Sequence, residues 1–160
     1  NMVGILVMKE YKLGSIHDYD WNKNNFELLK NVIKQVIFSM INAYNKKGFI
    51  HGDLHSGNIL LKPKRNYNII YENKLLDIID LEVVIMDFGS LKLNQINKTT
   101  DLIKNILKFL TSVENVCLNN NFIIYYQKDK IIKMRSIFSD RCDYDYYNEF
   151  DTIIDNMYIV

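Results

Sequence analysis

The chain has little of several residues that mark particular classes of protein. Its 160 residues include one proline, six glycines and two cysteines, which excludes a collagen-like repeat and a disulfide-rich scaffold. No apolar run approaches the roughly 20 residues needed to span a bilayer, and no secretory signal peptide is visible. The net charge of +1 gives no reason to expect nucleic-acid binding. We therefore expect a cytoplasmic protein with no nucleic-acid and no membrane partner.

The rest of the composition fits a globular domain. Apolar residues make up 48% and charged residues 24% of the chain, and a chain of this length can bury roughly two thirds of its unfolded surface. Asn, Ile and Lys occur 20, 23 and 17 times against three Arg, a bias that suits an AT-rich genome, including a viral one. Cys117 and Cys142 lack the spacing of metal ligands and indicate a reducing compartment.

One long helix is the best-specified element. From Phe26 to Tyr44 the apolar residues recur at intervals of three and four, which is the period of an amphipathic helix. Asn24 and Glu27 suit an N-cap with its capping-box partner, and Gly48 suits the C-terminal end.

Other elements are predicted from shorter patterns. Apolar runs predict strands at Gly4–Met8, Ile59–Leu61 and Val83–Met86. Further helices are expected over Asp101–Val113, capped by Thr99 or Thr100, and in pieces over Phe122–Tyr126, Ile131–Phe138 and Tyr146–Met157.

Two segments carry residue types suited to chemistry. The first reads His51-Gly52-Asp53-Leu54-His55-Ser56-Gly57-Asn58 and fits the pattern His-x-Asp-x-x-x-x-Asn. The second reads Asp87-Phe88-Gly89 and follows a predicted strand. Together they resemble the catalytic loop and the metal-binding loop of the protein-kinase-like superfamily. The resemblance implies an α+β, mainly α fold: the large C-terminal lobe of a kinase, with short β-hairpins around the two loops.

The resemblance also implies an ATP- and Mg²⁺-dependent phosphotransferase with four catalytic residues. Asp53 would orient the attacking hydroxyl or accept its proton, and His51 would hold the loop in shape. Asn58 and Asp87 would bind Mg²⁺ against the nucleotide phosphates, and so belong to both the metal site and the cofactor site. Gly89 would allow the backbone conformation that follows the metal-binding Asp.

The N-terminal part resembles the place where the two lobes of a kinase meet. Residues 1–16 are expected to form the last strand of the small lobe and the hinge, and residues 17–160 the large lobe. The backbone of Lys9, Glu10 and Tyr11 would bind the adenine edge. The sequence has no Gly-rich loop and no strand Lys for the phosphates, so we expect the small lobe to be absent and supplied in cis or in trans.

Asp101 allows two interpretations. It resembles the buried Asp that anchors the catalytic loop of a kinase from below, and it equally suits an ordinary acidic residue in the first turn of a helix.

Several features depart from protein kinases. Gly52 stands where those enzymes usually have Arg, the segment from Ser90 to Thr100 is short, and no Ala-Pro-Glu follows. The catalytic loop thus looks like that of aminoglycoside and choline phosphotransferases. Asn58 and Asp87 are also far apart, which suggests an inserted hairpin or loop within Asn66–Asp80.

Three functional hypotheses remain from the sequence. We favour a divergent Ser/Thr protein kinase acting on a hydroxyl-bearing substrate. A small-molecule kinase of the aminoglycoside type is the second hypothesis, and a pseudokinase-like binding module is the third. The sequence does not identify the substrate, the regulation or the oligomeric state.

Overall fold

The computed structural model describes residues 10–64, 69–71, 74–76, 81–95, 99–137 and 144–160. Its helices are α1 (Phe26–Lys47), α2 (Thr99–Asn119), α3 (Lys128–Ile137) and α4 (Tyr144–Asp155). Its strands are β1 (Ile59–Pro63), β2 (Ile69–Tyr71), β3 (Lys74–Leu76), β4 (Leu81–Ile85), β5 (Ile124–Tyr125) and β6 (Tyr158–Ile159). Three 3₁₀ turns, η1 (Lys23–Asn25), η2 (Ser56–Asn58) and η3 (Phe88–Ser90), complete the description. The predicted mainly helical α+β composition is confirmed.

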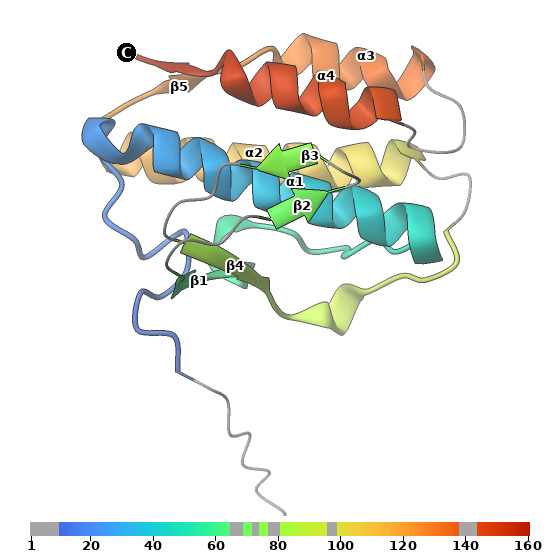
Figure 1. Ribbon diagram of the computed structural model, residues 1–160, viewed down its shortest axis with the longest axis horizontal. Coiled ribbons are helices and arrows are strands. Elements are labelled where there is room, and N and C mark those ends of the chain that lie inside the picture. Colours follow the sequence, from blue (N-terminus) through green and yellow to red (C-terminus); the bar gives the residue numbers. More distant parts are fainter. Residues whose placement is uncertain (1–9, 65–68, 72–73, 77–80, 96–98, 138–143) are drawn as a thin grey trace, which may run out of the picture.

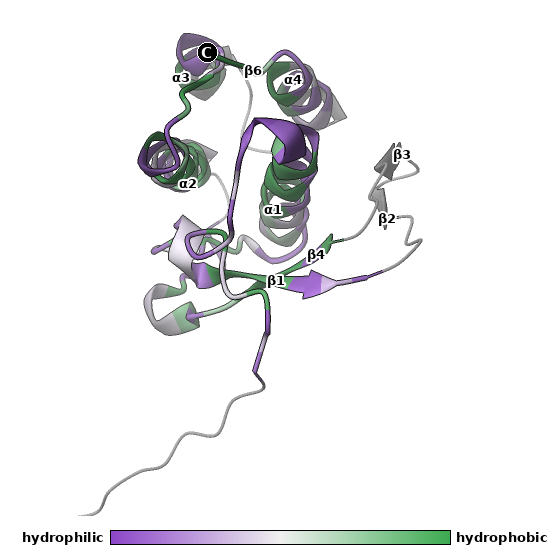
Figure 2. Ribbon diagram, turned by 90° about the vertical axis from the view of Figure 1, so that its left-hand side faces the viewer, coloured by the Kyte–Doolittle hydropathy of each residue, from purple (hydrophilic) through white to green (hydrophobic). Residues whose placement is uncertain are grey.

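The helices run side by side above a small sheet (Figure 1). Viewed end-on, α3 and α4 lie at one side, α1 and α2 in the middle, and β1 and β4 at the other side of α1 (Figure 2). The apolar faces of α1, α2 and α4 turn toward one another, and fully buried side chains from these helices form one core, among them Phe38, Ile41, Phe109 and Phe150.

Helix α1 is central to this arrangement and confirms the predicted long helix. It ends at Gly48, whose φ of 57° is left-handed and whose N–H donates to the Tyr44 carbonyl. The predicted cap at its start is wrong. The chain enters α1 through η1, so the capping box moves upstream: Asn22 accepts from the N–H of Asn24, and the Asn25 side chain accepts from the N–H of Asn22.

Strands β1 and β4 form an antiparallel pair against α1. Their register runs from Ile59 opposite Ile85 to Pro63 opposite Leu81. A buried side chain of α1 completes their hydrogen bonding: Gln35 Nε2 donates to the Leu81 carbonyl at 2.8 Å, and its Oε1 accepts from the Val83 N–H at 3.1 Å. The Gln35 amide therefore bonds β4 as the edge of a neighbouring strand would.

The insertion between β1 and β4 contains the expected hairpin. Strands β2 and β3 pair antiparallel, with Ile69 opposite Leu76 and Tyr71 opposite Lys74. The prediction of a hairpin within Asn66–Asp80 is therefore confirmed for the residues described there.

The C-terminal third follows the predictions only in part. Helix α2 begins at Thr99 and continues to Asn119, so the two threonines lie in its first turn and the prediction that one of them caps it is wrong. Helices α3 and α4 occupy the predicted positions with shifted ends. The helix expected over Phe122–Tyr126 is wrong, because Ile124 and Tyr125 form β5 and pair with β6 at the end of the chain.

Two further predictions meet the limits of the described residues. The strand expected at Gly4–Met8 lies outside them, as does Cys142. Cys117 is described, and it is a buried free thiol whose pKa is raised to about 12 by burial. Across the described helices, none is long and apolar enough to cross a membrane.

Gln35→Met tests the role of the buried amide. This change keeps the volume of the side chain but leaves the Leu81 carbonyl and the Val83 N–H without their partner, so we expect a loss of about 1–3 kcal/mol in the free energy of unfolding. Lys46→Ala, at an exposed site on the same helix, should change it by less than about 0.5 kcal/mol. Equal urea-denaturation midpoints for the two variants would contradict this role.

Candidate active site

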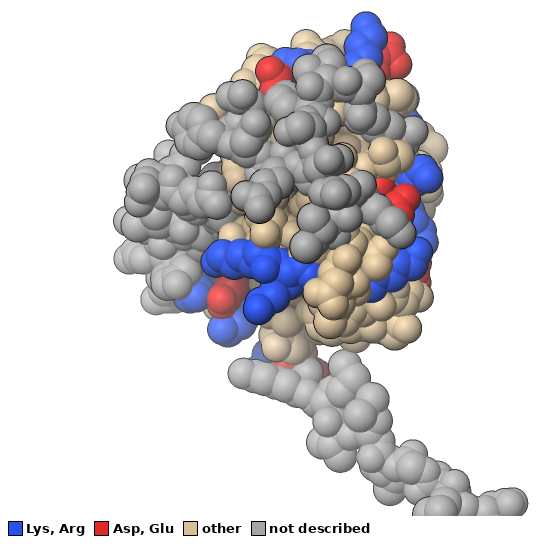
Figure 3. Space-filling view, turned by 90° about the vertical axis from the view of Figure 1, so that its right-hand side faces the viewer, with Lys and Arg blue, Asp and Glu red and all other residues tan. Residues whose placement is uncertain are grey.

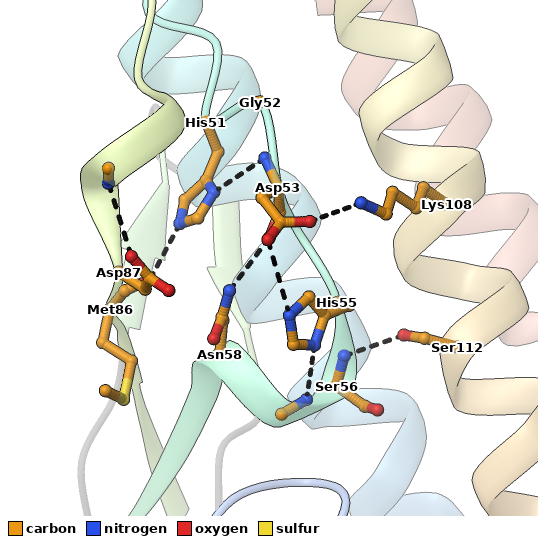
Figure 4. Close-up of polar contacts among 12 residues, drawn as sticks. His51, Gly52, Asp53, His55, Ser56, Asn58, Met86, Asp87, Lys108 and Ser112 are labelled. Atoms are coloured by element: carbon orange, nitrogen blue, oxygen red, sulfur yellow. Dashed lines mark hydrogen bonds and ion pairs between the residues drawn. The ribbon is translucent and has the colours of Figure 1, made fainter.

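The predicted catalytic loop connects α1 to β1. Its start is fixed by a two-way bridge, in which the N–H groups of Ile50 and Lys92 each donate to the other residue's carbonyl at 2.9 Å. Its end is fixed by η2, where the Asn58 N–H donates to the His55 carbonyl at 3.0 Å. The Met86 N–H donates to the Asn58 carbonyl at 3.0 Å, so the end of the loop lies beside the segment that carries Asp87 (Figure 4).

His51 is fully buried between these two segments. One ring nitrogen, Nε2, lies 2.9 Å from the Met86 carbonyl, and the other, Nδ1, accepts from the Asp53 N–H at 3.3 Å. Since a carbonyl can only accept, the proton of the neutral ring resides on Nε2. His51 thus lies where a residue that shapes the loop would lie, and this role stays a prediction.

Asp53 projects from the loop with 41% of its side chain exposed. Its Oδ1 accepts from the ammonium group of Lys108 on α2, and its Oδ2 lies 3.8 Å from Nε2 of His55. The hydrogen bond from Lys108 holds the pKa of the Asp53 carboxyl below its usual value, with the positive charge of Lys108 as the second cause. Asp53 therefore carries an ionised carboxylate at neutral pH.

Asn58 is buried and turns its amide toward the same loop. Its Nδ2 donates to the Asp53 backbone carbonyl at 3.0 Å. Among the described residues, no hydrogen bond occupies its amide oxygen, so that oxygen is available as a ligand.

Asp87 lies two residues after the end of β4 and is the N-cap of η3. Its backbone is left-handed, with φ of 60°, and its Oδ1 accepts from the Gly89 N–H at 3.4 Å. The unusual conformation falls on Asp87 itself and not on Gly89, so the role predicted for Gly89 is wrong. The next residue, Phe88, packs its ring against those of His51 and Phe49, with centroids 5.3 and 6.0 Å away.

Helix α2 holds the catalytic loop through residues that sequence reasoning missed. Asn105 Oδ1 accepts from the Gly52 N–H at 2.9 Å, and Ser112 Oγ accepts from the Ser56 N–H at 2.8 Å. In the sequence, the signal for these two residues was their position beside the apolar stripe of α2. That pattern alone does not identify the loop residues that they contact.

Asp101 does not anchor the loop. Its carboxylate pairs with Lys104 at 3.5 Å, and within the described part of the chain it makes no hydrogen bond to the catalytic loop. Asp101 is therefore the first-turn helix acid of the two interpretations, and Asn105 makes the anchoring contact one turn later.

Gly52 cannot carry a side chain in this structure. Its φ of 84° is left-handed, and a Cβ built on it would lie 2.2 Å from the Ser90 carbonyl oxygen, far inside any real contact. The Arg of protein kinases would not fit here without moving η3. The absence of that Arg is therefore a consequence of how tightly the loop packs on the segment after Asp87.

The hinge-like residues are only partly described. Lys9 lies outside the described residues, Glu10 is exposed and Tyr11 is half-buried. The Tyr11 carbonyl accepts from the Gly14 N–H at 2.9 Å, which commits that acceptor to a turn. The chain then runs beside β1 through an isolated bridge between Ser15 and Leu60.

The free oxygens at the site suit a hard cation. Asn58 offers an amide oxygen and Asp87 a carboxylate oxygen, and Mg²⁺ prefers such ligands, completing its shell with water and phosphate oxygens. No cluster of three or more His, Cys, Asp or Glu able to hold a metal occurs in the described ranges. These residues therefore fit a metal that is held jointly with a nucleotide.

Three exposed lysines lie beside the start of the catalytic loop. Lys46 and Lys47 end α1 and Lys92 pairs with Ile50 just beyond it, and all three are exposed. On the side of the molecule where α1 ends, Lys and Arg cover more of the visible surface than Asp and Glu (Figure 3). Such a surface favours the approach of anionic groups such as phosphates.

Comparison with known proteins identifies the family. Residues 3–120 match the sequence pattern of the ABC1 atypical kinase-like domain. The chain belongs to this family. The prediction of a protein-kinase-like superfamily member is confirmed, and the family supports a phosphotransferase-like function.

One curated relative extends this result. A probable serine/threonine-protein kinase of Dictyostelium discoideum is 30% identical to this ABC1-type chain over 141 residues, which are 84% of the chain and 10% of the relative. The chain thus spans about a tenth of the length of that protein. No solved structure matches the chain significantly.

Gly52→Ala tests the tight packing of the loop. The added methyl group meets a backbone oxygen and the residue must keep a positive φ, so we expect a loss of about 1–3 kcal/mol in the free energy of unfolding. Gly57→Ala is the matched control, because Gly57 has no positive φ and its Cβ would meet only the His55 ring, at 3.1 Å. Comparable thermal melting of both variants would show that Gly52 is not sterically required.

Proposed function

We propose that this ABC1-type domain belongs to a phosphotransferase that moves the γ-phosphoryl group of ATP to a hydroxyl. The observation that carries the proposal is the convergence of Asp53, Asn58 and Asp87. They come from two segments joined through His51 and the Asn58–Met86 hydrogen bond, and Figure 4 shows the three side chains in the same neighbourhood.

Each of these residues has a role in the proposed transfer. Asp53 orients the attacking hydroxyl with its ionised carboxylate and receives the hydroxyl proton as the new bond forms. Asn58 and Asp87 hold Mg²⁺, which when bound with ATP neutralises charge on the phosphates. Asn58 also fixes the Asp53 backbone through its amide N–H, so the metal ligand and the backbone of Asp53 keep the same position relative to each other.

The remaining parts of the nucleotide site are proposed from the resemblance. Residues 1–16 form the end of a small lobe and the hinge, and residues 17–160 the large lobe. The backbone of Lys9, Glu10 and Tyr11 binds the adenine edge, with the Tyr11 carbonyl excluded because it is used in a turn. A small lobe, in cis or in trans, supplies the phosphate loop and its Lys.

The favoured acceptor is a Ser or Thr hydroxyl of a protein. The Dictyostelium relative, a probable serine/threonine-protein kinase, supports this class. A small-molecule acceptor is the second candidate, because Gly52 is sterically required and the segment after Asp87 packs directly on the loop. That arrangement removes the Arg through which protein kinases commonly sense a phosphorylated activation loop.

Binding of Mg·ATP tests the nucleotide site. Asp87→Ala should weaken binding at least roughly tenfold, since removing even an outer partner of a metal ligand costs 10- to 100-fold. Asp129→Ala, at an exposed acidic site on α3, should leave it unchanged. Calorimetric titration of the 160-residue chain and of its longest natural form makes the measurement. No binding by either form would exclude the enzyme and leave the binding-module hypothesis.

Turnover tests the role of Asp53. In a form of the protein that transfers phosphate, Asp53→Asn should lower kcat by about 100-fold or more, because positioned proton acceptors contribute that much, while the dissociation constant of Mg·ATP stays within about twofold. Asp101→Asn is the matched control. Equal loss of turnover and ATP affinity would contradict the assigned role. A basic test protein and a panel of hydroxylated small molecules, assayed in parallel, distinguish the two acceptor classes.

A further inference from the structure

One face of α2 contacts the catalytic loop at three residues. Asn105, Lys108 and Ser112 are spaced three and four apart, so they lie in one row along the helix. In order, they contact Gly52, Asp53 and Ser56. Figure 4 shows Lys108 and Ser112 reaching the loop from the same side. The row therefore sets the position of the whole loop relative to the helix.

Lys108 differs from the other two members of the row. Asn105 and Ser112 accept from backbone N–H groups and so hold the path of the chain, whereas Lys108 donates to the Asp53 carboxylate itself. The loop from His51 to Asn58 contains no Lys and no Arg. Lys108 thus places on the Asp53 side chain a positive charge that the loop does not provide.

The other contacts leave the carboxylate free to rotate. Asn58 bonds the backbone carbonyl of Asp53, and His51 accepts from its backbone N–H. In the described structure no other side chain hydrogen-bonds the carboxylate, and His55 Nε2 lies 3.8 Å from it, which is beyond hydrogen-bond range. Without Lys108, nothing among these contacts would fix the direction of the two carboxylate oxygens.

We propose that Lys108 is the positioning residue that holds the Asp53 carboxylate in place for the attacking hydroxyl. The inference rests on the proposed phosphoryl transfer, in which alignment of the nucleophile matters more than covalent chemistry. The ion pair engages Oδ1 and leaves Oδ2 for the hydroxyl. Because both side chains are about half exposed, at 53% and 41%, the pair contributes little to folding stability, and the role left for it is alignment.

The test compares three variants in a form of the protein that transfers phosphate. Lys108→Met keeps the length of the side chain and removes its charge, Lys108→Arg keeps the charge, and Lys104→Met removes a similar ion pair one turn earlier on α2. We expect Lys108→Met to lower kcat by roughly 100-fold, the cost of a small misplacement of a reacting group, with KM for Mg·ATP within about twofold. Lys108→Arg should recover most of the loss, and Lys104→Met should match the wild type.

Each other outcome overturns the inference. Unchanged kcat in Lys108→Met, or an equal loss in Lys104→Met, would show that the contact is incidental or that α2 is generally sensitive. A raised KM for Mg·ATP with unchanged kcat would assign Lys108 to nucleotide binding. An Arg variant as impaired as the Met variant would exclude a role for the charge. A wild-type protein without transfer activity in any natural form would overturn the proposed function and this inference together, whereas an active enzyme indifferent to Lys108 overturns the inference alone.

Discussion

The buried imidazole of His51 joins the two parts of the chain that carry the candidate site. Its Nε2 bonds the carbonyl of Met86, which lies 35 residues away along the sequence. Its Nδ1 accepts from the N–H of Asp53, two residues away. A neutral ring with a single proton satisfies both contacts, because one partner only accepts and the other only donates. The relative position of the loop and of Asp87 depends on this ring, and the packing of Phe88 against it encloses the arrangement.

Helix α2 provides the second support of the loop. Asn105 and Ser112 accept hydrogen bonds from the loop N–H groups that face the helix, and such backbone groups need a partner when they are not in contact with water. A loop held this way keeps its shape before any ligand arrives, so less of the binding energy would be used to order it. The support comes from a helix whose other face is buried in the core, so the loop is tied to the core through α2.

The sequence predicted the elements that depend on local patterns. Helix α1 follows from its period and from Gly48, and the two loops follow from motif spacing. What it could not predict depends on tertiary partners. Gln35 interrupts an apolar face without indicating that β4 lies there, and the row Asn105, Lys108 and Ser112 does not reveal which loop it contacts. The segment Phe122–Tyr126 is apolar in a pattern that suits a helix or a strand. Within it, Ile124 and Tyr125 form a strand because they pair with β6 at the end of the chain.

The register of β1 and β4 has a consequence for how this family can change over time. Pro63 lies opposite Leu81, so the chain leaves the strand pair and returns to it at adjacent points. Segments inserted between such points can grow or shrink at small cost, because doubling the length of a loop costs only about 0.6 kcal/mol. The stretch between β1 and β4 is therefore a place where a chain of this fold can acquire new surface, while the pairing at the other end of the same two strands still sets the relative position of Asn58 and Asp87.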